Sequence, residues 1–141
     1  MTIKRWLAAG AAVLTAALVW EAGPAIAHHA SGPFYDPDRR VEIEGPVTRF
    51  VFRNPHAFLF VTAKDPQGVE TEWQIELGAP VSLRRTGWTP DTLTAGTLVK
   101  VSGQASRAEG SHGMCCVRMT RADGSPILAG GRVEEAQTPP R

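Results

Sequence analysis

The segment from residue 69 to residue 77, VETEWQIEL, alternates strictly between two kinds of side chain. One set of alternate positions is Val69, Thr71, Trp73, Ile75 and Leu77. The other set is Glu70, Glu72, Gln74 and Glu76. Because successive side chains of a strand point to opposite faces of a sheet, the pattern predicts a half-buried strand. Its carboxylates are expected on the solvated face, where alternating glutamates normally lie, rather than in a catalytic acid–base pair.

Strand signals of similar length surround one short helical segment. The segment 41–52 has Gly45-Pro46 in its middle, which predicts a bulge or bend in a long first strand. The segment 79–88 predicts a short helix closed by Gly87, with Trp88 plugging the barrel beneath it. Further strands are expected in 57–65, 97–105 and 114–124. We therefore expect an all-β fold, a small five-stranded OB-like barrel with one short helix between strands 3 and 4. A lipocalin would need a longer chain, and an immunoglobulin-like sandwich has no place for the helix.

The N-terminal residues have the three parts of a secretory signal peptide. Lys4 and Arg5 form a basic start, an apolar run follows over 7–20, and Ala25-Ile26-Ala27 places small residues where signal peptidase cuts. The uncharged run of about 14 to 16 residues is shorter than the roughly 20 that a membrane-spanning helix requires. We therefore expect cleavage after Ala27, a periplasmic or secreted protein, and no stable membrane insertion afterwards.

Cleavage at this point would leave 114 of the 141 residues, enough for one small domain. The expected organisation is a signal peptide (1–27), an N-terminal arm (28–40), a β-barrel domain (41–129) and a disordered tail (130–141). Removal of the signal peptide leaves 13 basic and 13 acidic residues of the original 15 and 14. A neutral chain without blocks of like charge has no electrostatic basis for binding nucleic acid or an anionic membrane, so neither is expected as a partner.

Several short motifs follow one another along this predicted domain. They are His28-His29 at the expected mature start, NPHA at 54–57, ELGAP at 76–80, LRRTGW at 83–88 and LTAGTLVKVSG at 93–103. In this order they resemble a family of short exported bacterial proteins known only as a domain of unknown function. The resemblance covers nearly all of residues 28–129 and implies a small β-barrel and export, without an activity or a ligand. The family usually has small polar residues where this chain has Met114-Cys115-Cys116, so the resemblance does not extend to the cysteines.

His28 is the first residue of the expected mature chain, and a terminal histidine can chelate a metal through its α-amine and its Nδ1 atom. Both nitrogens titrate near neutral pH, so they can be deprotonated there at modest cost. A second imidazole would complete a T-shaped set of three nitrogens, which suits Cu(II). His56 is the preferred partner because Asn54-Pro55 fixes a turn in front of it, and His29 can replace or assist His28. The alternative is that the terminal histidines are solvated and that His56 is an ordinary turn residue.

A secondary group of candidate copper ligands lies in and after the glycine-flanked loop EGSHGM. His112 and Met114 offer an imidazole and a soft sulfur, and Cys116 offers a thiol, a set that suits Cu(I). Flexible loops organise ligands poorly, so the alternative interpretation of His112 is a loop residue without a ligand.

Cys115 and Cys116 are adjacent, so they cannot form an ordinary loop-spanning disulfide within one chain. On a regular strand they would point to opposite faces, which predicts one buried and one accessible thiol. Three alternatives remain open at this point. They are a vicinal disulfide, an intermolecular bridge through Cys116, and thiolate assistance to a copper ion held by His112 and Met114.

The chain lacks the sequence signatures of common enzyme sites. It has no C-x-x-C motif, no nucleophile elbow and no glycine-rich phosphate loop. A copper-brace oxidase is the one form of enzyme that the sequence supports, and whether the protein is an enzyme is left open. The expected function is an exported soluble β-barrel binding protein that carries, buffers or senses copper. The alternative is a periplasmic interaction module for a periplasmic or membrane protein partner, in which the histidines have no metal role.

Overall fold

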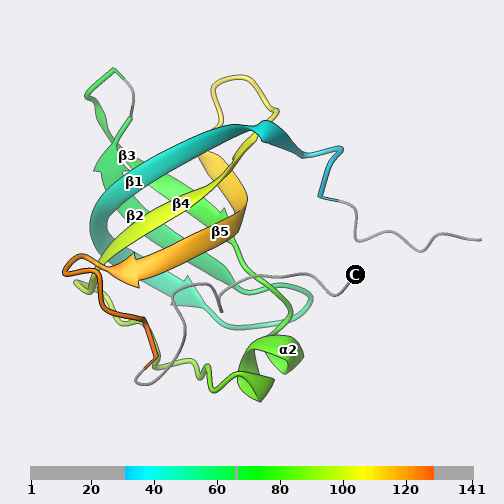
Figure 1. Cartoon of the computed structure of the whole chain (residues 1–141), viewed down its shortest axis with the longest axis vertical. Helices are drawn as coiled ribbons and strands as arrows, with labels where there is room; N and C mark the ends of the chain where they lie inside the picture. The colour runs from blue at the N-terminus through cyan, green and yellow to red at the C-terminus, as the bar shows by residue number, and fades with distance from the viewer. Residues whose placement is uncertain (1–30, 66, 129–141) are drawn as a thin grey trace, which may run out of the picture. The chain divides into compact units, whose positions relative to one another are not determined.

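The computed structural model describes residues 31–65 and 67–128. The expected signal peptide, His28, His29 and the expected tail lie outside the described residues. The strands are β1 (Tyr35–Val51), β2 (Phe58–Lys64), β3 (Glu70–Glu76), β4 (Leu98–Ser106) and β5 (Gly113–Arg121). Within the described part of the chain the only helix is α2 (Pro80–Arg85), between β3 and β4 (Figure 1). The predicted all-β class and the order of three strands, one helix and two strands are confirmed.

The strands close into a barrel in the order β1-β2-β3-β5-β4, with β4 paired back to β1 (Figure 1). Neighbouring strands are antiparallel except for β3 and β5, which run parallel. With a helix between the third and fourth strands, this is the arrangement of the OB-type barrel. Closure pairs the two edges of the sheet with each other, so their backbone groups are not left as open strand edges.

β1 pairs with two neighbours, each along a different part of its length. Its first part, from Tyr35 to Pro46, pairs with β4, and the remainder pairs with β2. Gly45 lies close to this change of partner, and a Cβ atom built there would come within 2.0 Å of the Thr62 carbonyl oxygen. Glycine permits two backbones to approach this closely because it has no side chain. β1 changes partner directly after the Gly45-Pro46 pair, and its bulge lies between Val47 and Arg49.

β1 also begins earlier than the barrel boundary expected at residue 41. Tyr35 and Asp36 pair with the end of β4, and the ladder resumes at Arg40 after an irregular stretch that contains Pro37. Proline lacks the N–H group that a regular ladder requires. The polar sequence of 35–40 has no apolar alternation, so nothing local in it indicates a strand. β1 therefore includes residues that the sequence pattern assigned to the arm.

Helix α2 lies at one end of the barrel (Figure 1). It begins at Pro80, where a missing N–H costs no helical hydrogen bond, and it is followed by Gly87 at φ +96°, a conformation that favours glycine. Leu83 and Trp88 are buried in the core, and the Trp88 ring packs edge-on against Phe50 with centroids 6.0 Å apart. The closing glycine and the buried Trp88 agree with the sequence prediction.

The barrel interior is filled by apolar residues from all five strands. On β3, Trp73 and Ile75 are buried, whereas Glu70 and Glu72 are exposed, which confirms the alternation within the strand. Val69, which was expected on the buried face, precedes the strand and is 60% exposed. Glu76 is the exception among the glutamates, because it is half-buried although it belongs to the outer face. Within residues 31–65 and 67–128, no helix has the length and apolar character needed to cross a membrane.

Candidate functional site

His56 lies in the loop between β1 and β2, after the cis peptide bond of Asn54-Pro55. The β2–β3 ladder continues past Phe58 into this loop, because the Leu77 N–H donates to the Ala57 carbonyl at 2.8 Å. Ala57 is fully buried in the core. Side chains alternate along extended backbone, so His56 falls on the outer face with Glu76 as its diagonal neighbour.

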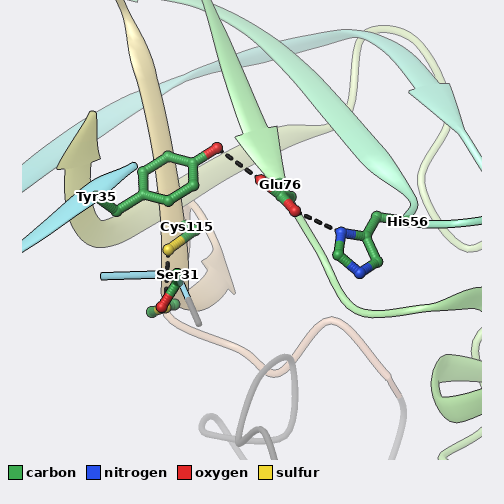
Figure 2. A network of polar contacts seen from close by, with 6 residues as sticks. Ser31, Tyr35, His56, Glu76 and Cys115 are labelled. Atoms are coloured by element: carbon green, nitrogen blue, oxygen red, sulfur yellow. Dashed lines mark hydrogen bonds and ion pairs between the residues drawn. The ribbon is translucent and has the colours of Figure 1, made fainter. Parts of the chain in front are cut away.

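The His56 and Glu76 side chains form a hydrogen-bonded pair on this face. The contact joins His56 Nδ1 to Glu76 Oε1, and the two side chains are 29% and 25% exposed (Figure 2). An ionised carboxylate can only accept hydrogen bonds, so the Nδ1–H group donates. In a neutral ring with the proton on Nδ1, the lone pair lies on Nε2.

Tyr35 holds the second oxygen of the same carboxylate. Its hydroxyl donates to Glu76 Oε2 at 2.7 Å, so Glu76 lies between a phenol and an imidazole (Figure 2). Burial, followed by the hydrogen bond and the negative charge of Glu76, raises the pKa of Tyr35 well above its usual range. The hydroxyl therefore keeps its proton and remains a donor to Glu76 throughout the neutral pH range.

Cys115 and Cys116 lie where β5 is irregular. Gln104 pairs with Cys115 and Ser102 pairs with Arg118, so two residues of β5, Cys116 and Val117, face Gly103 alone. This is a β-bulge, and Cys116 takes φ 53°, a left-handed conformation that non-glycine residues rarely adopt. A Cβ atom at Gly103 would lie 2.5 Å from Val117 Cγ1 and 2.7 Å from the Cys115 carbonyl oxygen, so the bulge requires glycine opposite it.

Because of the bulge, the side chains of residues 114–117 do not point to the alternate faces expected of a regular strand. Met114 and Val117 are both in the core cluster, whereas Cys115 is buried outside that cluster and Cys116 is half-buried. The two cysteine Sγ atoms are 2.8 Å apart, and both are free thiols. The Cys116 thiol also donates to Ser31 Oγ at 3.6 Å. One thiol is thus buried and the other more accessible, as expected, but both sulfurs lie on one side of the strand.

The cysteine pair lies close enough to Tyr35 and Glu76 to interact with them electrostatically. The negative charge of Glu76 and the neighbouring Cys116 thiol add to burial, the largest cause, in raising the pKa of Cys115, and both cysteines raise the pKa of Tyr35. We call the whole set the Tyr35–Glu76 network. Its six residues are Ser31, Tyr35, His56, Glu76, Cys115 and Cys116 (Figure 2).

An open pocket of about 540 Å³ adjoins this network. Tyr35 and Glu76 form part of its wall, together with Phe34 and Arg107. The Phe34 side chain is 69% exposed, which is unusual for a large apolar residue. The Arg107 guanidinium lies 3.5 Å from Asp36 Oδ1 and also donates from Nε to the Gly32 carbonyl. These contacts attach the start of β1 to the end of β4.

His112 and Met114 occupy surroundings different from the network. His112 Nε2 lies 3.8 Å from Asp65 Oδ2, and its ring packs edge-on against Trp73 with centroids 5.2 Å apart. Met114 is fully buried in the barrel core. Its sulfur could bind an ion on the surface loop of His112 only if the core opened. Cys116, the third member of this secondary set, belongs to the Tyr35–Glu76 network instead.

The described residues do not by themselves assemble a metal site. No group of three or more His, Cys, Asp or Glu side chains in residues 31–65 and 67–128 could hold a metal ion. Of the three primary candidates, only His56 is described, and the proposed terminal ligands His28 and His29 lie outside this part of the chain. Whether the chain can bind copper therefore depends on the hydrogen bonding of His56 and on ligands from outside the described residues.

Sequence reasoning singled out His56 and the cysteines but missed Tyr35 and Glu76. Glu76 follows the same alternation as the exposed glutamates of β3, and Tyr35 lies in a stretch that was assigned to the arm. The sequence nevertheless contained an indication of this pair, because His56 lies in the motif NPHA and Glu76 lies in the motif ELGAP. Their proximity becomes apparent once the β2–β3 register is known.

Comparison with known protein families supports the resemblance seen in the motifs. Residues 16–115 match the model of a family of unknown function, DUF6152. Comparisons with curated proteins and with solved structures gave no match. The family match includes Tyr35, His56 and Glu76 and ends at Cys115, so Cys116 falls outside it. The chain therefore belongs to DUF6152, a family of unknown function.

Proposed function

We propose that this protein is an exported small β-barrel that binds copper at its mature N-terminus. The ligands are the α-amine and Nδ1 of His28 and the imidazole of His56, with His29 as a supporting or substitute ligand. The role is carriage, buffering or sensing of the ion. The observation that carries the proposal is the hydrogen bond between His56 Nδ1 and the Glu76 carboxylate.

This hydrogen bond resembles the support that metal-binding histidines receive. A histidine ligand usually donates its other ring N–H to a carboxylate or carbonyl, which fixes the tautomer, orients the ring and makes the ligating nitrogen more basic. Glu76 accepts such a hydrogen bond from His56, and Tyr35 in turn orients Glu76. The ligating atom of His56 is then Nε2.

The position of Ser31 supports a terminal ligand near this ring. Ser31 is in contact with Cys116, within the same network that contains His56 and Glu76. His28 is three residues earlier in the sequence, a length of chain that spans at most about 11 Å. If signal peptidase cleaves after Ala27, the free amino group of His28 lies within that reach of Ser31.

The donor set determines the choice of ion. One amine and two imidazoles provide nitrogen ligands in a tetragonal arrangement, which is the geometry that Cu(II) prefers. Cu(II) also has the highest affinity for such ligands among the divalent first-row ions. When bound, copper would supply a redox-active, positively charged centre beside the network.

Titration of Cu(II) into protein that begins at His28, followed by calorimetry and electron paramagnetic resonance, tests the proposal. We expect one tightly bound Cu(II) with nitrogen ligands, and loss of tight binding when one Met precedes His28 or in His56→Ala. His112→Ala is the matched control and should bind as the unmodified protein does. Tight binding that survives both the added Met and His56→Ala would contradict the terminal site. Sequencing the N-terminus of the exported form tests cleavage after Ala27.

A second candidate function is a periplasmic interaction module without a metal role. The observation that favours it is the open pocket beside Tyr35, which is lined by the strongly exposed Phe34 and by Arg107. An apolar ring beside a guanidinium suits a partner that offers an apolar side chain near a carboxylate. Co-purification of one protein partner from metal-depleted cells, lost in Phe34→Ala, would favour this function over copper binding.

A further inference from the structure

We propose that Cys115 and Cys116 form a dithiol–disulfide exchange site, in which the folded barrel holds two adjacent cysteines ready to close a reversible vicinal disulfide. The partner is a disulfide compound, such as oxidised glutathione or a disulfide on another protein. This inference is independent of copper binding, because it requires only groups within the described residues.

The bulge in β5 brings the two thiols together. On a regular strand, adjacent side chains point to opposite faces, and two consecutive cysteines cannot approach each other. Here Cys116 takes φ 53° opposite Gly103, and its Sγ lies 2.8 Å from Cys115 Sγ. The left-handed conformation is unfavourable for a non-glycine residue and persists only when its surroundings impose it. The surroundings here are the closed barrel and the space left by Gly103.

The two thiols differ in accessibility, which assigns their roles. Cys115 is 4% exposed, whereas Cys116 is half-buried and reaches Ser31 at the edge of the described chain. Exchange is therefore expected to begin at Cys116, with Cys115 acting second.

The exchange has two balanced steps. The Cys116 thiolate attacks one sulfur of oxidised glutathione, a mixed disulfide forms, and the first glutathione leaves with the proton that Cys116 gave up. The sulfur of Cys115 then attacks Cys116 Sγ, the bond between the two cysteines forms, and the second glutathione leaves with the proton of Cys115. Two protein thiols are oxidised to one disulfide, and one glutathione disulfide is reduced to two thiols.

The disulfide would also change the start of the described chain. Cys116 Sγ would lose its proton and could no longer donate to Ser31 Oγ. Ser31 immediately follows the segment that contains His28 and His29. The redox state of the pair is thereby connected to the contact of Cys116 with Ser31.

The test is equilibration of the whole chain with reduced and oxidised glutathione in the presence of a metal chelator, followed by acid quenching and mass spectrometry. The folded protein should lose two hydrogens, carry no stable glutathione adduct, and recover both hydrogens with dithiothreitol. The ratio of pair disulfide to glutathione adduct should be at least about tenfold higher in the folded protein than in urea, because the folded barrel holds the two thiols together.

Two variants separate the roles of the cysteines. Cys115→Ser should trap glutathione on Cys116, because the second thiol is absent, whereas Cys116→Ser should form an adduct much more slowly. A persistent glutathione adduct on Cys116 of the unmodified protein would overturn the proposal. An equal ratio of pair disulfide to adduct in the folded chain and in urea would also overturn it, and this comparison requires no variant to fold.

Discussion

The Tyr35 hydroxyl donates to Glu76 Oε2 at 2.7 Å and thereby joins the first residue of β1 to the last residue of β3. These strands are not neighbours in the barrel, because β2 separates them on one side and β4 with β5 on the other. The bond therefore crosses the ring of strands at one end, where the His56–Glu76 pair and the two cysteines also lie.

The hydrogen bond between Tyr35 and Glu76 predicts an unusual titration. Tyr35 is the single tyrosine of the chain, so its phenolate can be followed by ultraviolet absorbance without competition from another tyrosine. Burial first, and then the hydrogen bond and charge of Glu76, raise its folded-state pKa above the usual value near 10. We expect phenolate to appear in the folded protein only well above pH 10, and at the ordinary pH in urea.

The same shift has a consequence for stability. A group whose pKa is raised on folding stabilises the fold fully below its unfolded pKa, and the stabilisation is lost as pH rises through the folded pKa. The free energy of unfolding should therefore fall above pH 10 in the unmodified protein more steeply than in Tyr35→Phe. Urea denaturation at neutral pH should show Tyr35→Phe to be destabilised by about 1–2 kcal/mol. Thr48→Val, which removes an exposed hydrogen bond to Glu72, is the control and should cost less than about 0.5 kcal/mol.

Glu76→Gln should weaken copper binding at the proposed terminal site. The amide cannot supply the negative charge that orients the His56 ring and makes it more basic, and the loss of such support typically lowers metal affinity about 10- to 100-fold. Glu72→Gln is the matched control, because Glu72 lies on the same face of β3 but contacts Thr48 and Arg49 instead of His56. The affinities are compared by Cu(II) calorimetry. Equal affinities for the two variants would contradict a supporting role for Glu76.

Gly45→Ala should strongly destabilise the barrel. The new Cβ atom would lie 2.0 Å from the Thr62 carbonyl oxygen, a backbone atom that cannot move without disturbing β2. Overpacking of this kind typically costs about 1–3 kcal/mol, and contact with backbone places the expected loss at the upper end. Gly32→Ala, whose Cβ would meet nothing within 4 Å, should change the free energy of unfolding by less than about 0.5 kcal/mol. Urea denaturation of both variants measures the difference.

Trp88→Ala should remove the packing that closes the barrel beneath α2. Trp88 is 2% exposed and packs against Phe50, so truncation is expected to cost about 3–5 kcal/mol. Trp88→Phe should cost less, because it keeps an aromatic ring and removes a buried Nε1–H that has no hydrogen-bond partner among the described residues. Val81→Ala on the exposed side of α2 serves as the control. Thermal denaturation compares the stabilities of the three variants. A Trp88→Ala protein as stable as Val81→Ala would contradict the proposed role of Trp88 in closing the barrel.

Much of the fold follows from patterns that are local in the chain. The alternation over 69–77 predicts one buried face of β3, the Gly45-Pro46 pair predicts a bulge or bend in β1, and Gly87 predicts the end of α2. Each of these signals depends on residues close together in sequence. The start of β1 lacked such a signal, because Tyr35 and Asp36 belong to the sheet through their pairing with β4 rather than through an apolar pattern.

The candidate site was only partly predictable for a related reason. His56 and the two cysteines stand out by residue type, whereas Glu76 resembles the exposed glutamates four and six positions before it, Glu72 and Glu70. Strand alternation assigns a residue to a face but does not say what covers that face. Tyr35 covers Glu76 only because β1 closes the ring with β4 and brings the start of β1 to the end of β3.

The sequence by itself determined the β class, the order of elements and membership of a family of unknown function, since these depend on short patterns and motifs. Tertiary structure alone decided that Glu76 lies between Tyr35 and His56, and that the bulge opposite Gly103 turns Cys115 and Cys116 toward each other. The physical reason is that strand register and barrel closure bring together residues far apart in the chain, and local alternation contains no information about either.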